Sequence, residues 1–296
     1  MIQILAAFFF LASGFVANKV LLGFLPPIFF VGIRMLAAGL VMICYSYYSS
    51  KTFRFSRIKN DLLPIIGIAL FTSYLPSILK AYGLKGLVAS KAALIGSCDP
   101  FVTSLYAYFL WNEKLTWRKF FGICIGFSGV AYLLFAKSSG QELGTAFSIF
   151  SWAELAALGS VFVSRYGWIV VRSFIKKDTY KPVEINGLSM FCSGLLGLTT
   201  SCFVDNIAAI QIPSMTYFLG FFIYTIVAGN IIGYGWYVYN LKRYNLTLIS
   251  LCGFSIPLFV SLLSVLSFGQ TLTTTFAVSA AIIFAGLLLF HSDSKI

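Results

Sequence analysis

The chain contains a long internal duplication. Residues 82–129 align without a gap onto residues 239–286, at an offset of 157 residues, and thirteen of these 48 positions are identical. A shared apolar composition does not explain the identities, because proline, glycine, lysine and tyrosine are among them. The period is also far too long for a solenoid of short repeats. We therefore expect two related halves, residues 1–140 and residues 141–296.

The composition places the chain in a lipid bilayer. Hydrophobic residues make up 59% and charged residues 10% of the 296 residues, which leaves too little polar surface for a soluble globule of this length. Apolar stretches of roughly 17 to 25 residues, each long enough to cross a bilayer as a helix, recur along the chain. They lie at about residues 2–22, 28–48, 62–82, 89–111, 117–136, 148–172, 185–204, 215–240, 246–268 and 275–291.

These stretches, five in each half, predict an all-α integral membrane protein with ten transmembrane helices. An odd number of spans per half turns the second half upside down in the membrane, so the halves form two inverted five-helix repeats. Such repeats commonly hold a binding site at their interface, and we expect a central cavity there. In a membrane protein, two homologous halves are typical of a secondary transporter.

The basic residues indicate the orientation, because positive residues are retained on the cytoplasmic side. With a cytoplasmic N-terminus, fourteen basic residues fall in or beside the inner loops and four lie on or near the outer side. The inner ones are Lys51, Arg54, Arg57, Lys59, Lys114, Arg118, Lys119, Arg172, Lys176, Lys177, Lys181, Lys242, Arg243 and Lys295; the outer ones are Lys80, Lys85, Lys91 and Lys137. We predict a multi-pass protein of the cytoplasmic (inner) membrane with both termini cytoplasmic. The net charge of +12 then reflects this bias and contact with lipid headgroups, and requires no nucleic-acid partner.

Residues suited to enzymatic chemistry are scarce. The six cysteines occur singly within apolar stretches, without the C-x-x-C spacing of metal or redox sites. The single histidine, His291, ends the last apolar stretch. The sequence shows no metal-ligand cluster and no paired catalytic acids, so we expect neither an enzyme nor a cofactor or bound metal.

Three stretches carry a family resemblance. Residues 25–34 join two prolines and two aromatic residues to an arginine, ahead of an alanine-rich run. Pro100 precedes the sequence Glu-Lys-Leu-Thr at residues 113–116, and a weaker copy of this pattern follows Pro257 at residues 269–273. In this order the motifs resemble the drug/metabolite transporter superfamily, specifically its ten-helix EamA-type branch. The resemblance implies a carrier that alternates access around a central cavity, and it says little about the substrate.

The chain departs from that family pattern at three positions. Asn112 replaces a glycine before Glu113, and Gln270 replaces the matching acid in the second half. Asp99 stands directly before Pro100, where the family pattern has a small or apolar residue. We expect the Asp99 difference to concern what is carried.

Asp99 is the deepest acid of the fourth apolar stretch. Ionisable side chains inside hydrocarbon are costly and normally face a cavity or a charged partner. Pro100 lacks the backbone N–H that would bond one turn earlier, so we predict a helix break beside the carboxylate. The repeat places a second break at Pro257, and Gly96 and Gly253 complete the two hinges. We expect Asp99 to bind a cation, a proton or an amine; the alternative is a structural ion pair.

The sixth apolar stretch offers a second polar group. Glu154 and Arg165 fall on one helical face but lie roughly 16 Å apart at 1.5 Å rise per residue, too far to pair with each other. Aligning the first apolar stretch with the sixth places Asn18 on Arg165, as expected if both helices face one cavity. We predict that Asn18, Glu154 and Arg165 bind substrate. The alternative for Glu154 is a solvated position at the outer interface.

The repeat also relates two polar faces on the third and eighth stretches. The 157-residue offset carries Ser73 onto Asn230, Ser77 onto Tyr234 and Lys80 onto Tyr237. Apart from Ser73, we predict that these residues contact substrate, and that Tyr74 adds to the wall. Lys80 has the alternative of a lysine that snorkels to the membrane interface. We assign Arg34 to helix packing or a lipid headgroup contact.

We expect a secondary active transporter that works by alternating access and moves a small polar, amine-bearing metabolite, such as an amino acid or an S-adenosylmethionine-like compound. A deep acid together with Lys80, Arg165 and several tyrosines suits a zwitterion held at both ends. A sugar-phosphate or other anionic-metabolite exchanger, and a flippase for lipid-linked substrates, are the alternatives. The expected partners are a small-molecule substrate and membrane lipid. A coupling proton, a counter-substrate, and a monomeric or homodimeric state are left open.

Overall fold

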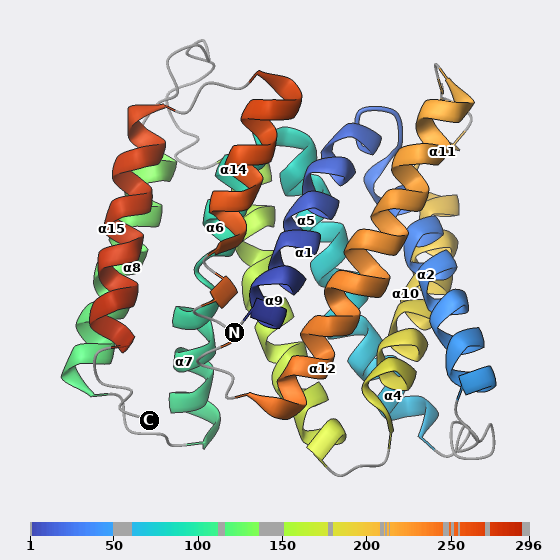
Figure 1. Ribbon diagram of the computed structural model, residues 1–296, viewed down its shortest axis with the longest axis horizontal. Helices are drawn as coiled ribbons and strands as arrows, with labels where there is room; N and C mark the ends of the chain where they lie inside the picture. Colours follow the sequence, from blue (N-terminus) through green and yellow to red (C-terminus); the bar gives the residue numbers. More distant parts are fainter. Residues whose placement is uncertain are drawn as a thin grey trace.

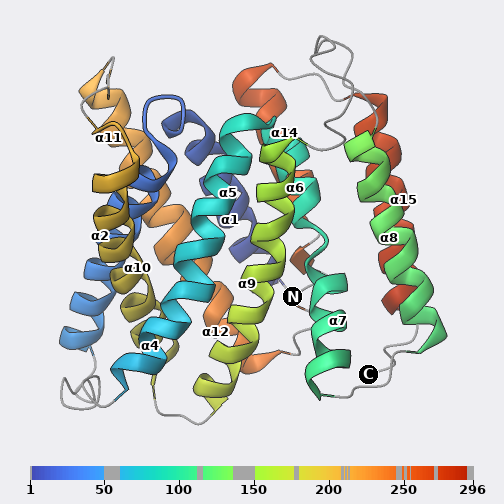
Figure 2. The same ribbon diagram turned by 180° about the vertical axis from the view of Figure 1, so that it is seen from behind.

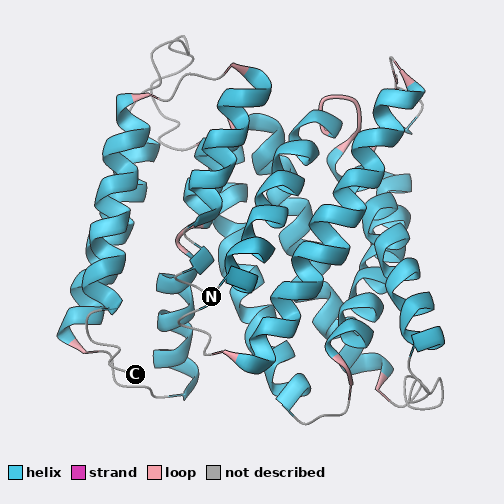
Figure 3. Cartoon of the chain, viewed as in Figure 1, coloured by secondary structure: helices cyan, strands magenta, loops and turns pink. Residues whose placement is uncertain are grey.

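In a computed structural model of the protein, all regular structure among the described residues is helical (Figure 3). The described residues are 2–49, 61–111, 116–135, 151–176, 180–207, 210, 212, 214–244, 249, 252–253, 255–269 and 273–291. The helices run roughly side by side, as those of a membrane bundle do (Figure 1). The expected all-α fold class is confirmed. The predicted boundary between the halves at residues 140 and 141, and the motif residues Glu113 and Gln270, lie outside the described residues.

Each expected apolar stretch contains helix. The helices of the first half are α1 (Ile2–Leu21), α2 (Pro27–Ser49), α4 (Leu62–Ala69), η1 (Leu70–Tyr74), α5 (Leu75–Gly86), α6 (Ala89–Gly96), α7 (Asp99–Trp111) and α8 (Trp117–Phe135). Those of the second half are α9 (Trp152–Lys176), α10 (Pro182–Val204), α11 (Met215–Tyr224), η3 (Thr225–Tyr234), α12 (Gly235–Arg243), α14 (Ser255–Phe268) and α15 (Thr274–His291). The elements η1 and η3 are π-helical and continue directly into the α-helices on either side of them.

Six described helices are long and apolar enough to cross a membrane. They are Gln3–Leu21, Pro27–Tyr48, Leu62–Gly86, Trp152–Val171, Pro182–Val204 and Met215–Asn240. Two shorter apolar helices, Ser255–Phe268 and Thr274–Phe290, lie in the last part of the chain. The chain is therefore a multi-pass helical membrane protein, and the count of ten spans stays a prediction.

The third and eighth stretches share a feature that the sequence pattern did not predict. Each is widened in its middle by a π-helical segment, η1 in one half and η3 in the other. The 157-residue offset places residues 70–74 on residues 227–231, within η3, so the distortion recurs in both halves. Pro76 at the start of α5 contributes to the first one, because it has no N–H to continue the ladder of backbone bonds.

Small residues bring the long helices close together. An added Cβ on Gly14 of α1 would lie 2.8 Å from the Cα of Gly229 in η3, so the two backbones nearly touch. A Cβ on Gly286 of α15 would lie 2.6 Å from the backbone nitrogen of Gly126 in α8. Such contacts are how membrane helices associate when lipid offers no hydrophobic driving force. The α8 and α15 pair stands to one side of the bundle (Figure 2), and the cavity lies among the remaining helices.

Candidate functional site

A cavity opens between helices of the two halves. The cavity has a volume of about 120 Å³, enough for several water molecules or part of a small solute. Its wall is formed by α1, α2, α5, α6, α7, α9, η3 and α14. The polar and charged lining residues are Asn18, Arg34, Ser77, Lys80, Ser97, Asp99, Ser160, Ser164, Arg165 and Tyr234. Helices of both halves therefore form the wall.

A helix break presents Asp99 to this cavity. The helix α6 ends at Gly96 and α7 begins at Asp99, and the backbone N–H of Phe101 bonds the carbonyl of Cys98 at 3.0 Å in a tighter turn. Pro100 is the physical cause, since it has no N–H to donate to the carbonyl of Gly96. The break expected at Pro100 is present in the structure. In the second half, α14 resumes at Ser255, and Pro257 is buried within its first turn.

Asp99 forms an ion pair within the cavity wall. Its Oδ1 lies 3.2 Å from the Nε of Arg165, and its side chain is 31% exposed while that of Arg165 is 9% exposed. Arg165 also donates a hydrogen bond from Nη1 to the hydroxyl of Tyr237, at 3.0 Å. The ion pair that the sequence left as the alternative for Asp99 is present, and the carboxylate also lines the cavity. Binding of a cation, a proton or an amine by Asp99 stays a prediction.

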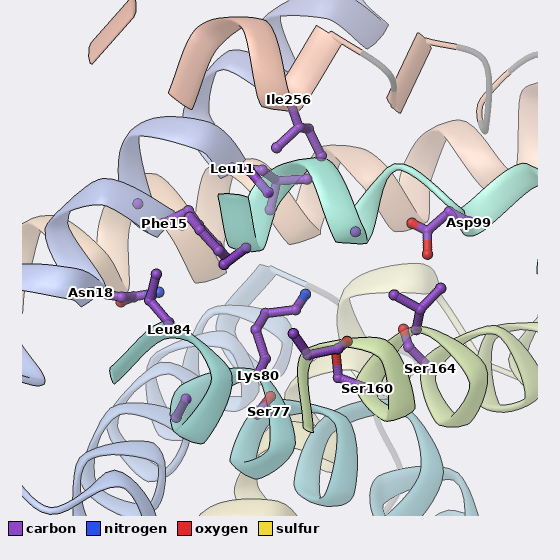
Figure 4. Close-up of a pocket in the computed structure, with 18 of the residues that line it drawn as sticks. Leu11, Phe15, Asn18, Ser77, Lys80, Leu84, Asp99, Ser160, Ser164 and Ile256 are labelled. Carbon is purple, nitrogen blue, oxygen red and sulfur yellow. The ribbon is translucent and has the colours of Figure 1, made fainter. Parts of the chain in front are cut away.

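Lys80 faces Asp99 across the cavity. Figure 4 shows the two side chains reaching into the space from opposite sides, Lys80 from α5 and Asp99 from the break between α6 and α7. Ser77 lies about one turn before Lys80 on the same wall. Lys80 is half-buried and its side chain points into the cavity, as expected of a residue that contacts substrate.

Equivalent positions of the two halves line the cavity together. Asn18 and Arg165 both contribute to the wall, as the alignment of the first and sixth stretches required. The 157-residue offset likewise pairs lining residues: Ser77 with Tyr234, Gly96 with Gly253 and Asp99 with Ile256. The Oδ1 atom of Asn18 is buried without a hydrogen-bond partner among the described residues. Equivalent positions of the two halves thus line the cavity but differ in polarity, and the acid Asp99 belongs to the first half.

Five residues predicted for the site or its hinges lie outside the cavity wall. Glu154 pairs with Lys91 at 2.7 Å and is buried, so the solvated position left open for it is wrong. Tyr74 bonds Thr200, Asn230 accepts from Arg34, and Tyr237 accepts from Arg165. Pro257 is buried in α14. Tyr237 and Asn230 therefore contact charged residues of the wall and stand one layer behind it.

Four polar or charged lining residues were not predicted from the sequence: Arg34, Ser97, Ser160 and Ser164. Ser160 and Ser164 of α9 line the cavity beside Arg165. Arg34 of α2, which we had assigned to packing or a lipid headgroup, also lines it and is 7% exposed. The sequence held a signal for Arg34, since an arginine inside an apolar stretch is functional by default.

The chain as a whole matches a known protein family. The model of the EamA-like transporter family matches residues 1–135 and again residues 151–291. The chain belongs to this family. The resemblance seen in its motifs is confirmed, and the division into two inverted repeats stays a prediction. As an EamA-like protein, the chain is a multi-pass membrane transporter and not an enzyme.

The chain is also similar, at about a quarter of identical residues, to individual proteins with curated names. The chain is 26% identical over 290 residues to a protein of Chlamydia muridarum named "S-adenosylmethionine/S-adenosylhomocysteine transporter", covering 97% of this chain and 90% of that one. It is 26% identical over 282 residues to a "Probable amino-acid metabolite efflux pump" of Salmonella typhimurium, covering 93% and 89%. A solved crystal structure superposes with a TM-score of 0.70 at 18% identity, over 97% of this chain and 94% of the other. That likeness establishes the fold alone.

Proposed function

We propose that this EamA-like protein is a secondary transporter of small metabolites that carry both an ammonium group and a carboxylate. The observation behind the proposal is that an acid, Asp99, and a cation, Lys80, face the same cavity from opposite walls. The names of two relatives agree with it, because amino acids and S-adenosylmethionine share the same ammonium and carboxylate groups. An amino acid or an S-adenosyl compound is the proposed cargo.

Each side chain has a distinct part in this proposal. Asp99 accepts hydrogen bonds from the ammonium group of the cargo, which competes with Arg165 for the carboxylate. Lys80 pairs with the carboxylate of the cargo, and Ser77 and Asn18 supply further polar contacts. Tyr234, which stacks on Trp168 at 6.3 Å between ring centroids, holds an aromatic face at the wall for a cationic or ring-bearing group.

Alternating access follows from the two halves and their hinges. In the first half the chain is free of regular helix between Gly96 and Asp99, so that α6 and α7 can tilt separately there. Gly253 and Pro257 occupy the equivalent positions in the second half. We propose that the halves rock about these points in the cytoplasmic membrane, with both termini cytoplasmic and a proton or a counter-substrate as coupling partner.

A second candidate is an exchanger of anionic metabolites such as sugar phosphates. It is favoured by the excess of cations in the wall, since Arg34, Lys80 and Arg165 face the single acid Asp99 among the described lining residues. This candidate needs the cations and tolerates loss of Asp99, whereas the zwitterion proposal needs both.

The test is a stability-shift screen on the purified full-length protein, because a ligand that binds the folded state raises its unfolding midpoint. We expect S-adenosylmethionine, S-adenosylhomocysteine or an amino acid to raise the midpoint, and sugar phosphates to have little effect. A hit is then followed by uptake into proteoliposomes. Sugar phosphates as the sole hits would replace the proposal by the second candidate.

The Lys80→Gln variant tests the wall directly. No hydrogen bond or ion pair joins Lys80 to another described residue, so the substitution is expected to leave the free energy of unfolding unchanged. It is expected to weaken cargo binding about tenfold or more, because the contact with the carboxylate of the cargo is lost. Lys91→Gln is the matched control, because Lys91 pairs with Glu154 outside the cavity. It is expected to lower stability modestly and to keep the affinity for cargo. Equal affinity in the parent and the Lys80 variant would remove Lys80 from the site.

A further inference from the structure

The guanidinium of Arg34 is buried in the cavity wall without a countercharge. Its Nη1 donates to the Oδ1 of Asn230 at 2.9 Å, and its carbon lies 5.2 Å from the ring centroid of Phe30. Its Nε is buried with no hydrogen-bond partner, and no carboxylate of the described residues lies within ion-pair distance of it. A buried charge in this state is costly, so either a ligand or a strong packing requirement has to explain it.

The other half of the molecule shows that packing does not require the charge. The helices α2 and α10 align at an offset of 155 residues, which pairs Pro27 with Pro182, Gly32 with Gly187, Met35 with Met190 and Gly39 with Gly194. In this alignment Arg34 falls on Ser189. The residue that Arg34 contacts, Asn230, is in turn the equivalent of Ser73.

The equivalent link in the other half is neutral. Ser189 and Ser73 share a hydrogen bond of 2.8 Å between their hydroxyl oxygens, in the same place as the bond between Arg34 and Asn230. The hydroxyl of Thr72 completes this neutral link, at 2.9 Å from that of Ser189. Hydroxyl groups alone are therefore enough to join the equivalent helices. Joining the helices therefore does not require the charge, the length or the extra N–H groups of Arg34. This side chain also lines the cavity.

We propose that Arg34 binds an oxyanion group of the transported molecule, with Lys80 as the second cation. A guanidinium has five N–H donors, and one of its nitrogens here is committed to Asn230, which leaves Nε and Nη2 for the anion. This inference rests on the proposed function and names Arg34 as the residue that binds the carboxylate of the cargo. A carboxylate of an amino-acid cargo and a phosphate of an anionic cargo present the same chemistry to Arg34, and the experiment separates them.

The experiment compares S-adenosylmethionine with its decarboxylated analogue, which keeps the ammonium and sulfonium charges and lacks the carboxylate. Affinities are measured for the full-length parent protein and for the double variant R34S/N230S, which copies the serine pair of the other half. The single variant R34Q is a second test in case the double variant does not fold, because it keeps a polar side chain at this position and leaves Asn230 in place. S189A is the matched control, since it removes the equivalent link in the other half and keeps Arg34.

We expect the parent and S189A to bind S-adenosylmethionine about tenfold or more tightly than the decarboxylated analogue. In R34S/N230S and R34Q this ratio is expected to fall close to one, with the affinity for the analogue little changed. A ratio near one in the parent, or the parent's ratio retained in the Arg34 variants, would overturn the proposal.

Inorganic phosphate at constant ionic strength provides an arm that does not depend on the cargo. If the parent binds neither nucleoside, an S-adenosyl compound is excluded as cargo, and phosphate decides the role of Arg34. A rise in the unfolding midpoint that the parent shows and the Arg34 variants lack supports an oxyanion site for phosphate-bearing cargo. Equal shifts in all variants would overturn the assignment of Arg34.

Discussion

The charges of the cavity wall are unbalanced at the residue scale. Among the described lining residues, Arg34, Lys80 and Arg165 are cations and Asp99 is the acid. Asp99 and Arg165 compensate each other, which leaves the charges of Arg34 and Lys80 for a ligand. A cargo that brings a carboxylate is therefore favoured electrostatically, and its ammonium group must compete with Arg165 for Asp99.

The coupling between Asp99 and Arg165 is measurable by a double-mutant cycle. Asp99→Asn and Arg165→Gln are each expected to lower the free energy of unfolding by about 1 to 3 kcal/mol, because each leaves the partner's charge uncompensated; the partial exposure of Asp99 keeps the cost below that of a fully buried pair. The double variant is expected to cost about 1 kcal/mol less than the sum of the single variants. Denaturant unfolding in detergent micelles measures this. Additive losses would show that the pair contributes nothing and that Asp99 is held by other contacts.

Two kinds of local irregularity shape the site at the scale of single elements. The break between α6 and α7 lies where the carboxylate of Asp99 lines the cavity. The π-helical segments η1 and η3 widen the helices that carry Lys80 and Tyr234, and such segments often mark functional positions. Close contact of α1 with η3 then keeps this distorted helix against its neighbour.

The contact between Gly14 and Gly229 provides a test of helix packing. We expect Gly14→Ala to lower the free energy of unfolding by about 1 to 3 kcal/mol, because its methyl group would lie 2.8 Å from the Cα of Gly229. Gly67→Ala is the control, since nothing lies within 4 Å of the added methyl group on α4. The control is expected to be neutral or slightly stabilising, as alanine favours helix. Equal effects of the two substitutions would mean that α1 and η3 separate without cost.

The whole molecule is a duplicated framework whose halves differ in chemistry. Asp99, Lys80 and Arg34 all belong to the first half, and their equivalents in the second half are Ile256, Tyr237 and Ser189. The two halves that we propose to rock thus share one framework, while the charges that we propose to bind the cargo come mainly from the first half. Arg165, equivalent to Asn18, is the charge that the second half contributes to the wall.

Topology is the prediction that belongs to the whole molecule. The end of α2 and the start of α4 lie at the opposite end of the bundle from the end of α10 and the start of α11, as inverted halves require (Figure 1). In a cysteine-free background, single cysteines placed in residues 205–214 or 137–147 are expected to react with an impermeant reagent added to intact cells. Cysteines in residues 49–61 or 173–182 are expected to react after permeabilisation. Labelling of these inner segments in intact cells would reverse the assigned orientation.

Much of this architecture is encoded locally along the chain. Hydropathy marks the helices because lipid requires about 20 apolar residues for each crossing. Pro100 marks the break in the fourth stretch because a missing N–H acts within its own turn. The repeat predicted Asn18, Ser77, Lys80 and Arg165 at one cavity, because homologous helices present equivalent faces to a shared interface. The cost of an acid inside an apolar stretch predicted Asp99 there.

The partners of those residues depend on how distant helices pack. Helical periodicity defines which face a side chain occupies, and it carries no information about the neighbour that the face meets. Arg34 reaches Asn230 across 196 residues of sequence, and Glu154 meets Lys91 on another helix, so neither contact could be read from local pattern. The structure therefore places Arg34, which we had assigned to packing or a lipid headgroup, in the wall of the cavity. Glu154, Tyr74 and Tyr237, which we had predicted to contact substrate, lie outside that wall.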